Sequence, residues 1–190
     1  MKRLILVTSP PACGKTYISK QLSKNLKHIV YLDKDTLLPL SKQIFRVAKK
    51  PYDRSSDFFE EQIRDYEYEV ILDLGFEALR YDDTVLINAP FTREIRDKAF
   101  MDGLKQKLKT LDATLFVIWV VTSKDICRER MLKRNSDRDI YKIKHWDEYI
   151  NSVDFSVPNT LDEGELMLFY NSSEAEYLKS MHDVLDILEN

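Results

Sequence analysis

Short apolar runs alternate along the chain with stretches in which apolar residues return every three or four positions. The runs are predicted strands, and they lie at residues 3–8, 29–32, 85–87, 113–121 and 166–170. The fourth run, ATLFVIWVV, is apolar at nearly every position, which is typical of a strand that is buried on both faces. Strands that alternate with helical stretches indicate βαβ units. The pattern therefore predicts a five-stranded parallel sheet with helices on both faces.

The helical stretches have apolar residues at helical spacing. These positions are Ile18, Leu22 and Leu26, then Ile63, Tyr66, Val70, Leu74 and Leu79, and finally Leu178, Met181, Leu185 and Leu188. Residues 37–81 contain no predicted strand, and we expect one or two helices around Pro51 followed by one long helix. Because no repeat, low-complexity tract or linker interrupts the pattern, residues 1–190 are expected to form a single α/β domain.

The composition agrees with one globular domain in a reducing compartment. The 190 residues are 44% hydrophobic and 32% charged, which is enough to bury a core without metal or disulfide support. Cys13 and Cys127 are too few for a disulfide framework. The apolar run after Arg3 is shorter than a signal peptide requires, and no run approaches the roughly 18 apolar residues of a membrane span. We therefore expect a cytoplasmic protein that does not enter a membrane.

The segment SPPACGKT matches the P-loop pattern G-x-x-x-x-G-K-[ST], except that Ser9 replaces the first glycine. Backbone N–H groups at the start of a helix bind phosphate oxygens, and the helix dipole favours their negative charge. Lys15 is expected to contact the β- and γ-phosphates, and the Thr16 hydroxyl is expected to bind Mg²⁺. Gly14 permits a close approach of the phosphate that a Cβ atom would block.

All eight residues of this segment are predicted to bind the nucleotide. They are Ser9, Pro10, Pro11, Ala12, Cys13, Gly14, Lys15 and Thr16. Ser9 is small enough to replace glycine with some backbone strain. Cys13 lies at a helix N-terminus, where thiol pKa values fall. We interpret it as a small residue that fits a tight loop rather than as a redox group.

Polar segments at residues 9–16, 33–35 and 88–91 each follow a predicted strand. Ligands bind beyond the carboxyl ends of parallel strands, so we expect these segments to converge there. A kinase needs carboxylates at this edge, one to accept the proton of the attacking hydroxyl and one to hold water on Mg²⁺. Asp35 is the predicted catalytic base, and Asp33 is the predicted metal residue, acting through water. The alternative for both is a solvated polar loop.

Arginines are frequent in the segment that follows the fourth predicted strand. Thr122 and Asp125 have the spacing of a capping box, which places a helix start there. Arg130 and Arg134 then share one helix face, and Arg138 lies beyond a break in the helix, in a segment expected to be mobile.

These three arginines are predicted catalytic residues on a small lid, assigned to residues 123–150. Guanidinium groups stabilise the charge of a transferring phosphoryl group, and a closing lid excludes water. The alternative is a surface helix with ordinary ion pairs.

The P-loop, the aspartate after the second strand, the Asn88-Ala89-Pro90 segment and the arginine-rich lid together resemble the small P-loop kinases. The likeness is to the branch that holds kinase-like AAA-type ATPases, zeta-toxin-type kinases and polynucleotide kinases, and residues 134–150 resemble a bacterial subgroup of it. The resemblance implies a three-layer P-loop NTPase fold, ATP as donor, Mg²⁺ and a lid over the phosphates. Leu38 replaces an arginine that is typical of polynucleotide kinases. Asn88 stands where members often have aspartate, which shifts more of the metal's outer shell to Asp33 and Asp35.

If ATP occupies the sheet edge, its acceptor is expected under the helices of residues 37–81. Arg46, Lys49, Lys50 and Arg54 in this region fit either a polar, partly anionic acceptor or a solvated face. The aromatic residues of the region are interpreted as core.

We therefore predict an ATP-dependent phosphotransferase that moves the γ-phosphoryl group of ATP to a hydroxyl of a small molecule. Asn171, after the fifth strand, is predicted to lie on the adenine side. One alternative is a nucleotide-binding regulatory ATPase that acts as a switch, and another is a polynucleotide 5′-kinase. The net charge of −3 and Leu38 argue against a nucleic-acid partner.

Overall fold

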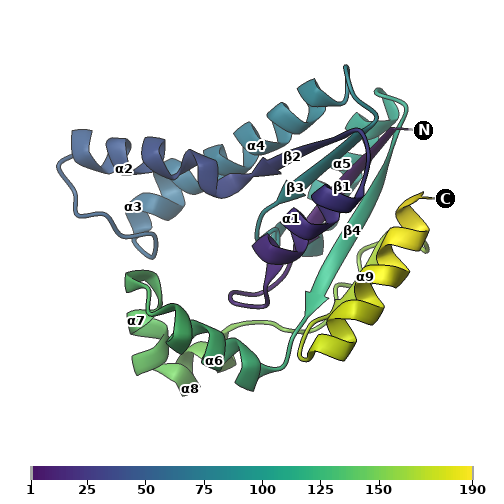
Figure 1. Ribbon diagram of the computed structural model, residues 1–190. Helices are drawn as coiled ribbons and strands as arrows, with labels where there is room; N and C mark the ends of the chain where they lie inside the picture. Colours follow the sequence, from purple (N-terminus) through teal and green to yellow (C-terminus); the bar gives the residue numbers. More distant parts are fainter. Residues whose placement is uncertain (1, 190) are drawn as a thin grey trace.

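Five parallel strands form one sheet in the order β2-β3-β1-β4-β5, as Figure 1 shows. This computed structural model describes residues 2–189, apart from the side chains of Asp137, Arg138 and Tyr141. The strands are β1 (Lys2–Thr8), β2 (Ile29–Asp33), β3 (Thr84–Asn88), β4 (Ala113–Val121) and β5 (Leu166–Tyr170). The predicted five-stranded parallel sheet is confirmed.

Helices and single helical turns connect the strands. The α-helices are α1 (Lys15–Asn25), α2 (Leu38–Val47), α3 (Asp57–Phe59), α4 (Asp65–Ala78), α5 (Lys98–Lys109), α6 (Lys124–Arg134), α7 (Asp137–Lys144), α8 (Trp146–Ser152) and α9 (Glu174–Glu189). A π-helical turn, η2 (Glu60–Arg64), joins α3 to α4, and 3₁₀ turns lie at η1 (Lys34–Leu37) and η3 (Glu94–Arg96). None of the helices in residues 2–189 is both long enough and apolar enough to cross a membrane.

Successive residues of the central strands supply two separate cores, because side chains of a strand alternate between the faces of the sheet. Leu6 and Trp119 pack in a core with α4 and α5. Val7 and Ile118 pack in a second core with α1 and α9. The predicted cover of helices on both faces is therefore confirmed.

The long helix predicted before β3 is present, but the apolar spacing predicted the wrong face of this helix as buried. Ile63 and Leu79 are buried as predicted, whereas Tyr66, Val70 and Leu74 are 64%, 43% and 46% exposed. The side of α4 that packs inward carries Glu67, Tyr68, Ile71, Leu72 and Gly75. The contacts of α4 with β2 and β3 decide which face is buried.

Two smaller expectations also need correction. Leu178 is 59% exposed, while the other predicted positions of α9 pack toward the core. Helix α6 begins at Lys124, because Ser123 is its N-cap and accepts a hydrogen bond from the Ile126 N–H. Thr122, predicted as that cap, donates its hydroxyl to the Cys13 carbonyl instead.

A buried carboxylate holds the helices before β3 together. Glu67 of α4 is 4% exposed and accepts hydrogen bonds from Lys34 of η1, from Ser41 of α2 and, through both terminal nitrogens at 2.7 Å, from Arg54. Burial alone would raise the pKa of the Glu67 carboxyl, but hydrogen bonds from Arg54, Lys34 and Ser41 outweigh burial and lower the pKa to about 2. Arg54, a candidate acceptor-side residue in the sequence, is therefore engaged in a structural ion pair.

Glu67→Gln is expected to reduce the free energy of unfolding by about 3 kcal/mol, because Lys34 and Arg54 lose their buried counter-charge. Chemical denaturation of the purified protein measures the effect. Glu69→Gln, on the exposed face of the same helix, is the matched control and should change stability by less than about 0.5 kcal/mol.

The effect of Glu67→Gln should also depend on pH. A carboxyl whose pKa is lowered in the folded state stabilises the protein at pH values above the ordinary pKa of that carboxyl. This contribution to stability disappears as the pH falls through the lowered pKa. The stability difference between wild type and the variant should therefore shrink between about pH 5 and pH 2. A difference that stays constant over this range would contradict the role assigned to the carboxylate.

Candidate active site

The P-loop joins the end of β1 to the start of α1 and adopts left-handed backbone at two positions. Ala12 has φ 66° and Gly14 has φ 99°. Left-handed residues next to right-handed ones turn successive N–H groups into a common concavity, which is an anion-binding nest. Ser9 has no positive φ, so the strain expected there is found at Ala12 instead.

Three donors fix the Cys13 carbonyl oxygen, which lies in the middle of this loop. Thr122 Oγ1, Arg130 Nη1 and Asn171 Nδ2 donate to it at 3.0, 3.1 and 2.7 Å. Arg130 also donates through Nη2 to the Asn171 carbonyl at 2.8 Å. The ends of β4 and β5 and helix α6 therefore hold the loop together.

Gly14 is required for a steric reason as well. A Cβ atom at this position would lie 2.5 Å from Asn171 Nδ2 and 3.4 Å from Arg130 Nη1. Both neighbours are already committed to the Cys13 carbonyl, so they cannot move without loss of these hydrogen bonds.

Gly14→Ala is expected to weaken nucleotide binding by at least about tenfold, because left-handed backbone costs an alanine about 1–2 kcal/mol and the new methyl group displaces Asn171. Isothermal titration calorimetry with Mg·ADP measures the change. Gly103→Ala is the matched control, since a Cβ there meets nothing within 4 Å in α5. The control should bind as wild type does and be more stable by up to about 1 kcal/mol.

A chain of polar side chains crosses the carboxyl edge of the sheet beside the P-loop. The strand register aligns Asn88 with Val7 of β1 and with Asp33 of β2. Asn88 Nδ2 donates to Thr16 Oγ1 at 3.0 Å and to Asp33 Oδ2 at 3.1 Å. The expected convergence of the three segments is thus observed for Thr16, Asp33 and Asn88.

Asp33 is held on both carboxylate oxygens. Tyr31 donates its hydroxyl to Oδ2 at 2.8 Å, and the Asp35 N–H donates to Oδ1 at 3.0 Å. Burial, followed by the neighbouring Asp33 carboxylate, raises the pKa of Tyr31, so this phenol remains a donor. An oxygen with these partners fits a role in the outer shell of a metal better than direct ligation.

These residues fit Mg²⁺ that arrives with a nucleotide. Asn88 is 4% exposed, and its Oδ1 has no hydrogen-bond partner among the described atoms. Thr16, Asp33 and Asn88 offer the oxygen atoms that Mg²⁺ prefers, and Mg²⁺ commonly takes its other ligands from phosphates and water. In the described part of the chain, no three His, Cys, Asp or Glu side chains form a metal-binding group.

Asn88→Asp is expected to destabilise the protein when no Mg²⁺ is present, because two carboxylates would then face each other at about 3 Å. Such a pair has a raised pKa, so the loss of stability should be larger at pH 8 than at pH 5. Thermal unfolding at both pH values, with and without Mg·ADP, measures it. Asn25→Asp, at the exposed end of α1, is the control and should show no such pH dependence.

Asp35 follows Asp33 in the exposed turn η1, beyond the end of β2. This places it near the edge where Thr16 and Asn88 meet. Its role as the catalytic base stays a prediction.

The arginines that the sequence analysis assigns to a lid have different partners in the structure. Arg130 reaches the P-loop backbone, as described above. Arg134 instead forms a bidentate pair with the fully buried Asp139, at 2.8 Å from both Nε and Nη2. Asn135, with φ 45°, ends α6 and turns the chain into α7. The Arg138 side chain lies outside the described residues.

Cys13 and Cys127 are both fully buried, and their sulfur atoms are 3.6 Å apart. The hydrogen bond from Cys127 lowers the pKa of the Cys13 thiol, with help from Lys15 and against the effect of burial. The hydrogen bond to Cys13, followed by burial, raises the pKa of Cys127. Cys13 therefore packs in the tight loop, as the sequence analysis favoured.

A pocket of about 590 Å³ opens beside the P-loop. It lies between the start of α1, helix α6 and the loop after β5, and Tyr17, Ile126, Asn171 and Tyr177 are among its lining residues. The rings of Tyr17 and Tyr177 are 5.7 Å apart. Asn171 thus borders this pocket, but its amide is directed at the Cys13 carbonyl, so it also positions the loop.

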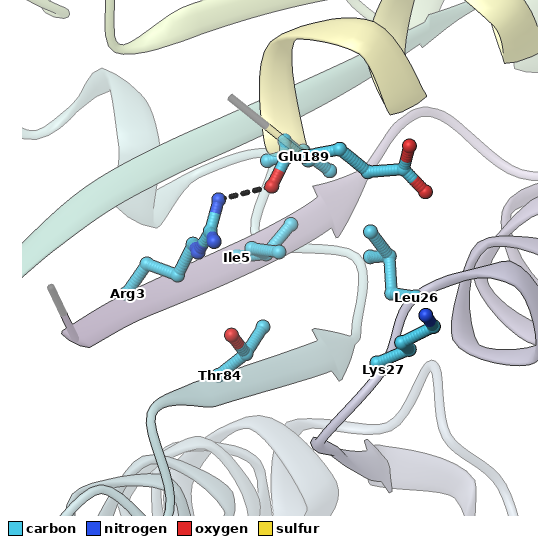
Figure 2. A pocket seen from close by; sticks show the side chains of 7 residues that line it. Arg3, Ile5, Leu26, Lys27, Thr84 and Glu189 are labelled. Carbon is cyan, nitrogen blue, oxygen red and sulfur yellow. Dashed lines mark hydrogen bonds between the residues drawn. The ribbon is translucent and has the colours of Figure 1, made fainter.

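A second pocket of about 320 Å³ lies at the other end of the strands, as Figure 2 shows. Arg3, Ile5, Thr84 and Glu189 are among its lining residues, and the Arg3 guanidinium donates to the Leu188 carbonyl. Because Arg3 and Thr84 lie at the amino-terminal ends of β1 and β3, this pocket is remote from the carboxyl edge and is not part of the site.

Sequence reasoning found the P-loop and the residues of the sheet edge but missed what holds them in place. The hydroxyl of Thr122, the guanidinium of Arg130 and the amide of Asn171 meet on one carbonyl from three elements. A local sequence pattern cannot predict that three side chains from distant segments will bind the same carbonyl oxygen. The signal that was available is the position of Thr122 and Asn171 directly after β4 and β5, where side chains reach the P-loop.

The parallel sheet, the helices on both of its faces and the P-loop together define an α/β fold of the P-loop NTPase type. The sequence profile of the AAA domain family matches residues 4–155, and the chain belongs to this family. None of the curated protein sequences is significantly similar to the chain.

Solved structures with the same fold include several P-loop proteins. A proposed kinase from Chloroflexus aurantiacus is 22% identical with TM-score 0.69, and the match covers 99% of this chain and 97% of that one. A gluconokinase from Sinorhizobium meliloti is 13% identical with TM-score 0.58, covering 98% and 95%. Kti12 from Chaetomium thermophilum, in complex with ADP-AlF3, is 19% identical with TM-score 0.57, covering 97% and 98%. At these identities the likeness establishes the fold alone.

Proposed function

We propose that the protein is an ATP-dependent phosphotransferase that moves the γ-phosphoryl group of ATP to a hydroxyl of a small molecule. The observation that carries the proposal is the contact of the P-loop with a row of metal-compatible oxygens, because Asn88 links Thr16 to Asp33 at the sheet edge. The pocket of about 590 Å³ beside the loop is large enough for a base and a ribose. The kinases among the structural neighbours support the same class of reaction.

In this proposal the P-loop nest and Lys15 bind the phosphates of ATP. Thr16 would bind Mg²⁺, and Asp33 and Asn88 would orient water bound to it. The metal, when bound, neutralises charge on the β- and γ-phosphates. Asp35 accepts the proton of the acceptor hydroxyl while the hydroxyl oxygen forms a bond to the γ-phosphorus. The bond from that phosphorus to the bridging oxygen breaks, and ADP leaves with the released charge.

The lid supplies positive charge and excludes water. Arg130 already contacts the P-loop backbone, so we place it close to the bound phosphates. Arg134 and Arg138 are the further lid arginines that we assign to the charge of the phosphoryl group. The water-free site limits transfer of the phosphoryl group to water.

The domain organisation, the family branch, the adenine side of the site and the cellular location are further parts of this proposal. Residues 1–190 act as one domain, with residues 37–81 on the acceptor side and residues 123–150 as the lid. We assign the chain to the zeta-toxin and polynucleotide-kinase-like branch, and we propose a small-molecule acceptor rather than a nucleic acid. Asn171 borders the adenine side, and a cytoplasmic location stays the prediction.

ADP release from Mg·ATP, measured against a panel of hydroxyl-bearing metabolites, tests the function. An acceptor should raise turnover well above the basal rate. Lys15→Ala should abolish turnover, and Asp35→Asn should lower it at least about a hundredfold while ATP still binds, which is the usual contribution of a general base. Asp83→Asn is the matched control, because Asp83 precedes β3 at the opposite end of the sheet.

Two results would overturn the proposal. Full activity of Lys15→Ala would remove the P-loop from the reaction. Tight ATP binding with no stimulation by any acceptor, and no effect of Asp35→Asn, would instead favour the regulatory ATPase.

A further inference from the structure

The two cysteines of the chain lie side by side, although they are 114 positions apart in the sequence. Cys13 belongs to the P-loop and Cys127 lies near the start of α6, and their Sγ atoms are 3.6 Å apart. Both are fully buried free thiols in the core that includes Ile18 and Phe169. The sequence analysis interpreted Cys13 alone as a small loop residue, because no local pattern shows that a second thiol lies beside it.

Helix α6 contacts Cys13 at two points. Cys127 contacts its sulfur atom, and Arg130 donates to its carbonyl oxygen at 3.1 Å. Residues three positions apart are neighbours on one face of a helix, so this face of α6 packs against the P-loop through both side chains. A bond between the two sulfur atoms would therefore act on the same residue whose carbonyl group accepts the three hydrogen bonds that fix the loop.

A disulfide between these thiols requires a movement of the P-loop. The sulfur atoms of a disulfide are about 2.05 Å apart, so this pair must approach by about 1.5 Å. Side chains in a packed core have little room to rotate, and part of the approach therefore falls on the backbone of Cys13. A misplacement of about 1 Å in a site that orients a ligand can cost on the order of a hundredfold in rate. Oxidation of the pair would thus disturb the phosphate nest.

The pocket beside the P-loop reaches the chain neighbours of both thiols. Gly14, which follows Cys13, and Ile126, which precedes Cys127, are among the residues that line this pocket of about 590 Å³. A local opening of the loop therefore exposes the sulfur atoms to the pocket without unfolding of the sheet. Openings of this kind need much less free energy than global unfolding.

We propose that Cys13 and Cys127 form a reversible disulfide that prevents nucleotide binding at the P-loop. This inference rests on the proposed function, because the site that it regulates is the nucleotide site. In the dithiol form the loop has the shape described above and binds phosphates. In the disulfide form the S–S bond draws Cys13 toward α6, and the N–H groups of the loop no longer converge on one phosphate.

Hydrogen peroxide is the oxidant in this proposal. A hydrogen bond from Cys127 and the charge of Lys15 lower the pKa of the Cys13 thiol, so Cys13 is the attacking group. Its thiolate attacks a peroxide oxygen, the O–O bond breaks, and hydroxide leaves, which yields a sulfenic acid. The Cys127 sulfur then attacks the Cys13 sulfur, the S–O bond breaks, and the hydroxyl group leaves as water with the Cys127 proton.

Two thiols and one peroxide thus give one disulfide and two water molecules. The thiols lose two electrons and the peroxide gains them. A small dithiol reverses the change, because it reduces the disulfide by thiol–disulfide exchange and is itself oxidised. In a reducing compartment the protein is therefore in the form that binds nucleotide until peroxide appears.

Peptide mapping and calorimetry on the purified full chain test the proposal. Brief treatment with a small excess of hydrogen peroxide, ended by catalase, should join the peptides that contain Cys13 and Cys127 within one chain and leave no free thiol. Isothermal titration calorimetry should then show that Mg·ADP binds at least about tenfold more weakly than it does to the reduced protein. Dithiothreitol should restore the affinity.

Cys127→Ala is the matched control, because it removes the second thiol and leaves the P-loop sequence unchanged. Arsenite, which reduces sulfenic acids but not disulfides, is added to the wild type and to the variant after the peroxide step. The treated variant should bind Mg·ADP within about twofold of its own reduced form. Circular dichroism verifies that the variant is folded, and the comparison of the two wild-type forms needs no variant.

Thermodynamic linkage supplies an independent measurement. If the disulfide weakens Mg·ADP binding tenfold, saturating Mg·ADP must favour the dithiol form by the same factor. For a two-electron couple this factor equals a rise of about 30 mV in the midpoint potential of the pair. Titration in thiol redox buffers with and without Mg·ADP, followed by a count of free thiols, measures the shift.

Four results would overturn the proposal. They are a treated wild type that keeps its thiols or is cross-linked between chains, an internally cross-linked protein that binds Mg·ADP as tightly as the reduced one, a midpoint potential that Mg·ADP does not shift, and an equal loss of affinity in treated Cys127→Ala. A reduced wild type that does not bind Mg·ADP would contradict the proposed function and the regulation together. Because disulfide formation is measured without nucleotide, the two failures are distinguishable.

Discussion

The carbonyl oxygen of Cys13 accepts three hydrogen bonds, and the shape of the P-loop depends on them. Left-handed backbone at Ala12 costs about 1–2 kcal/mol, and a buried hydrogen bond contributes about 1 kcal/mol. Three such bonds therefore offset the strain and keep the N–H groups of the loop aimed at one point. The donors come from the ends of β4 and β5 and from α6, so the shape of the loop depends on the sheet and on this helix.

The same hydrogen bonds connect the P-loop to α6. Arg130 belongs to α6, the first helix of the proposed lid, and it bridges the carbonyls of Cys13 and Asn171. A movement of α6 would therefore change the support of the P-loop directly. Arg134 links α6 to α7 through Asp139. The shape of the P-loop and the position of the proposed lid are thus linked by contacts within the chain.

The parts of the structure that depend on local pattern could be predicted from the sequence. Apolar runs identified all five strands, and the spacing of residues 9–16 identified the P-loop, because strand burial and phosphate binding both impose local rules. The position of Asp33 and Asn88 at one edge followed from the parallel topology.

Features that depend on distant partners could not be predicted. Glu67 carries no local sign that Lys34 and Arg54 will bury its charge. Which side of α4 is buried depends on its contacts with β2 and β3. The apolar spacing in the sequence therefore predicted as buried a side that the fold leaves largely exposed. The pair of Arg134 with Asp139, by contrast, joins residues only five positions apart and matches the ion-pair alternative of the sequence analysis, while the catalytic role of Arg134 stays a prediction.

The central claim is that the backbone of the P-loop binds nucleotide phosphates. Hydrogen exchange of the segment 9–17, measured by mass spectrometry with and without Mg·ATP, tests this most directly. The account predicts that nucleotide strongly slows exchange in this segment, with smaller slowing in α6, which holds the Cys13 carbonyl through Arg130. Unchanged exchange in the segment at saturating Mg·ATP would contradict the account.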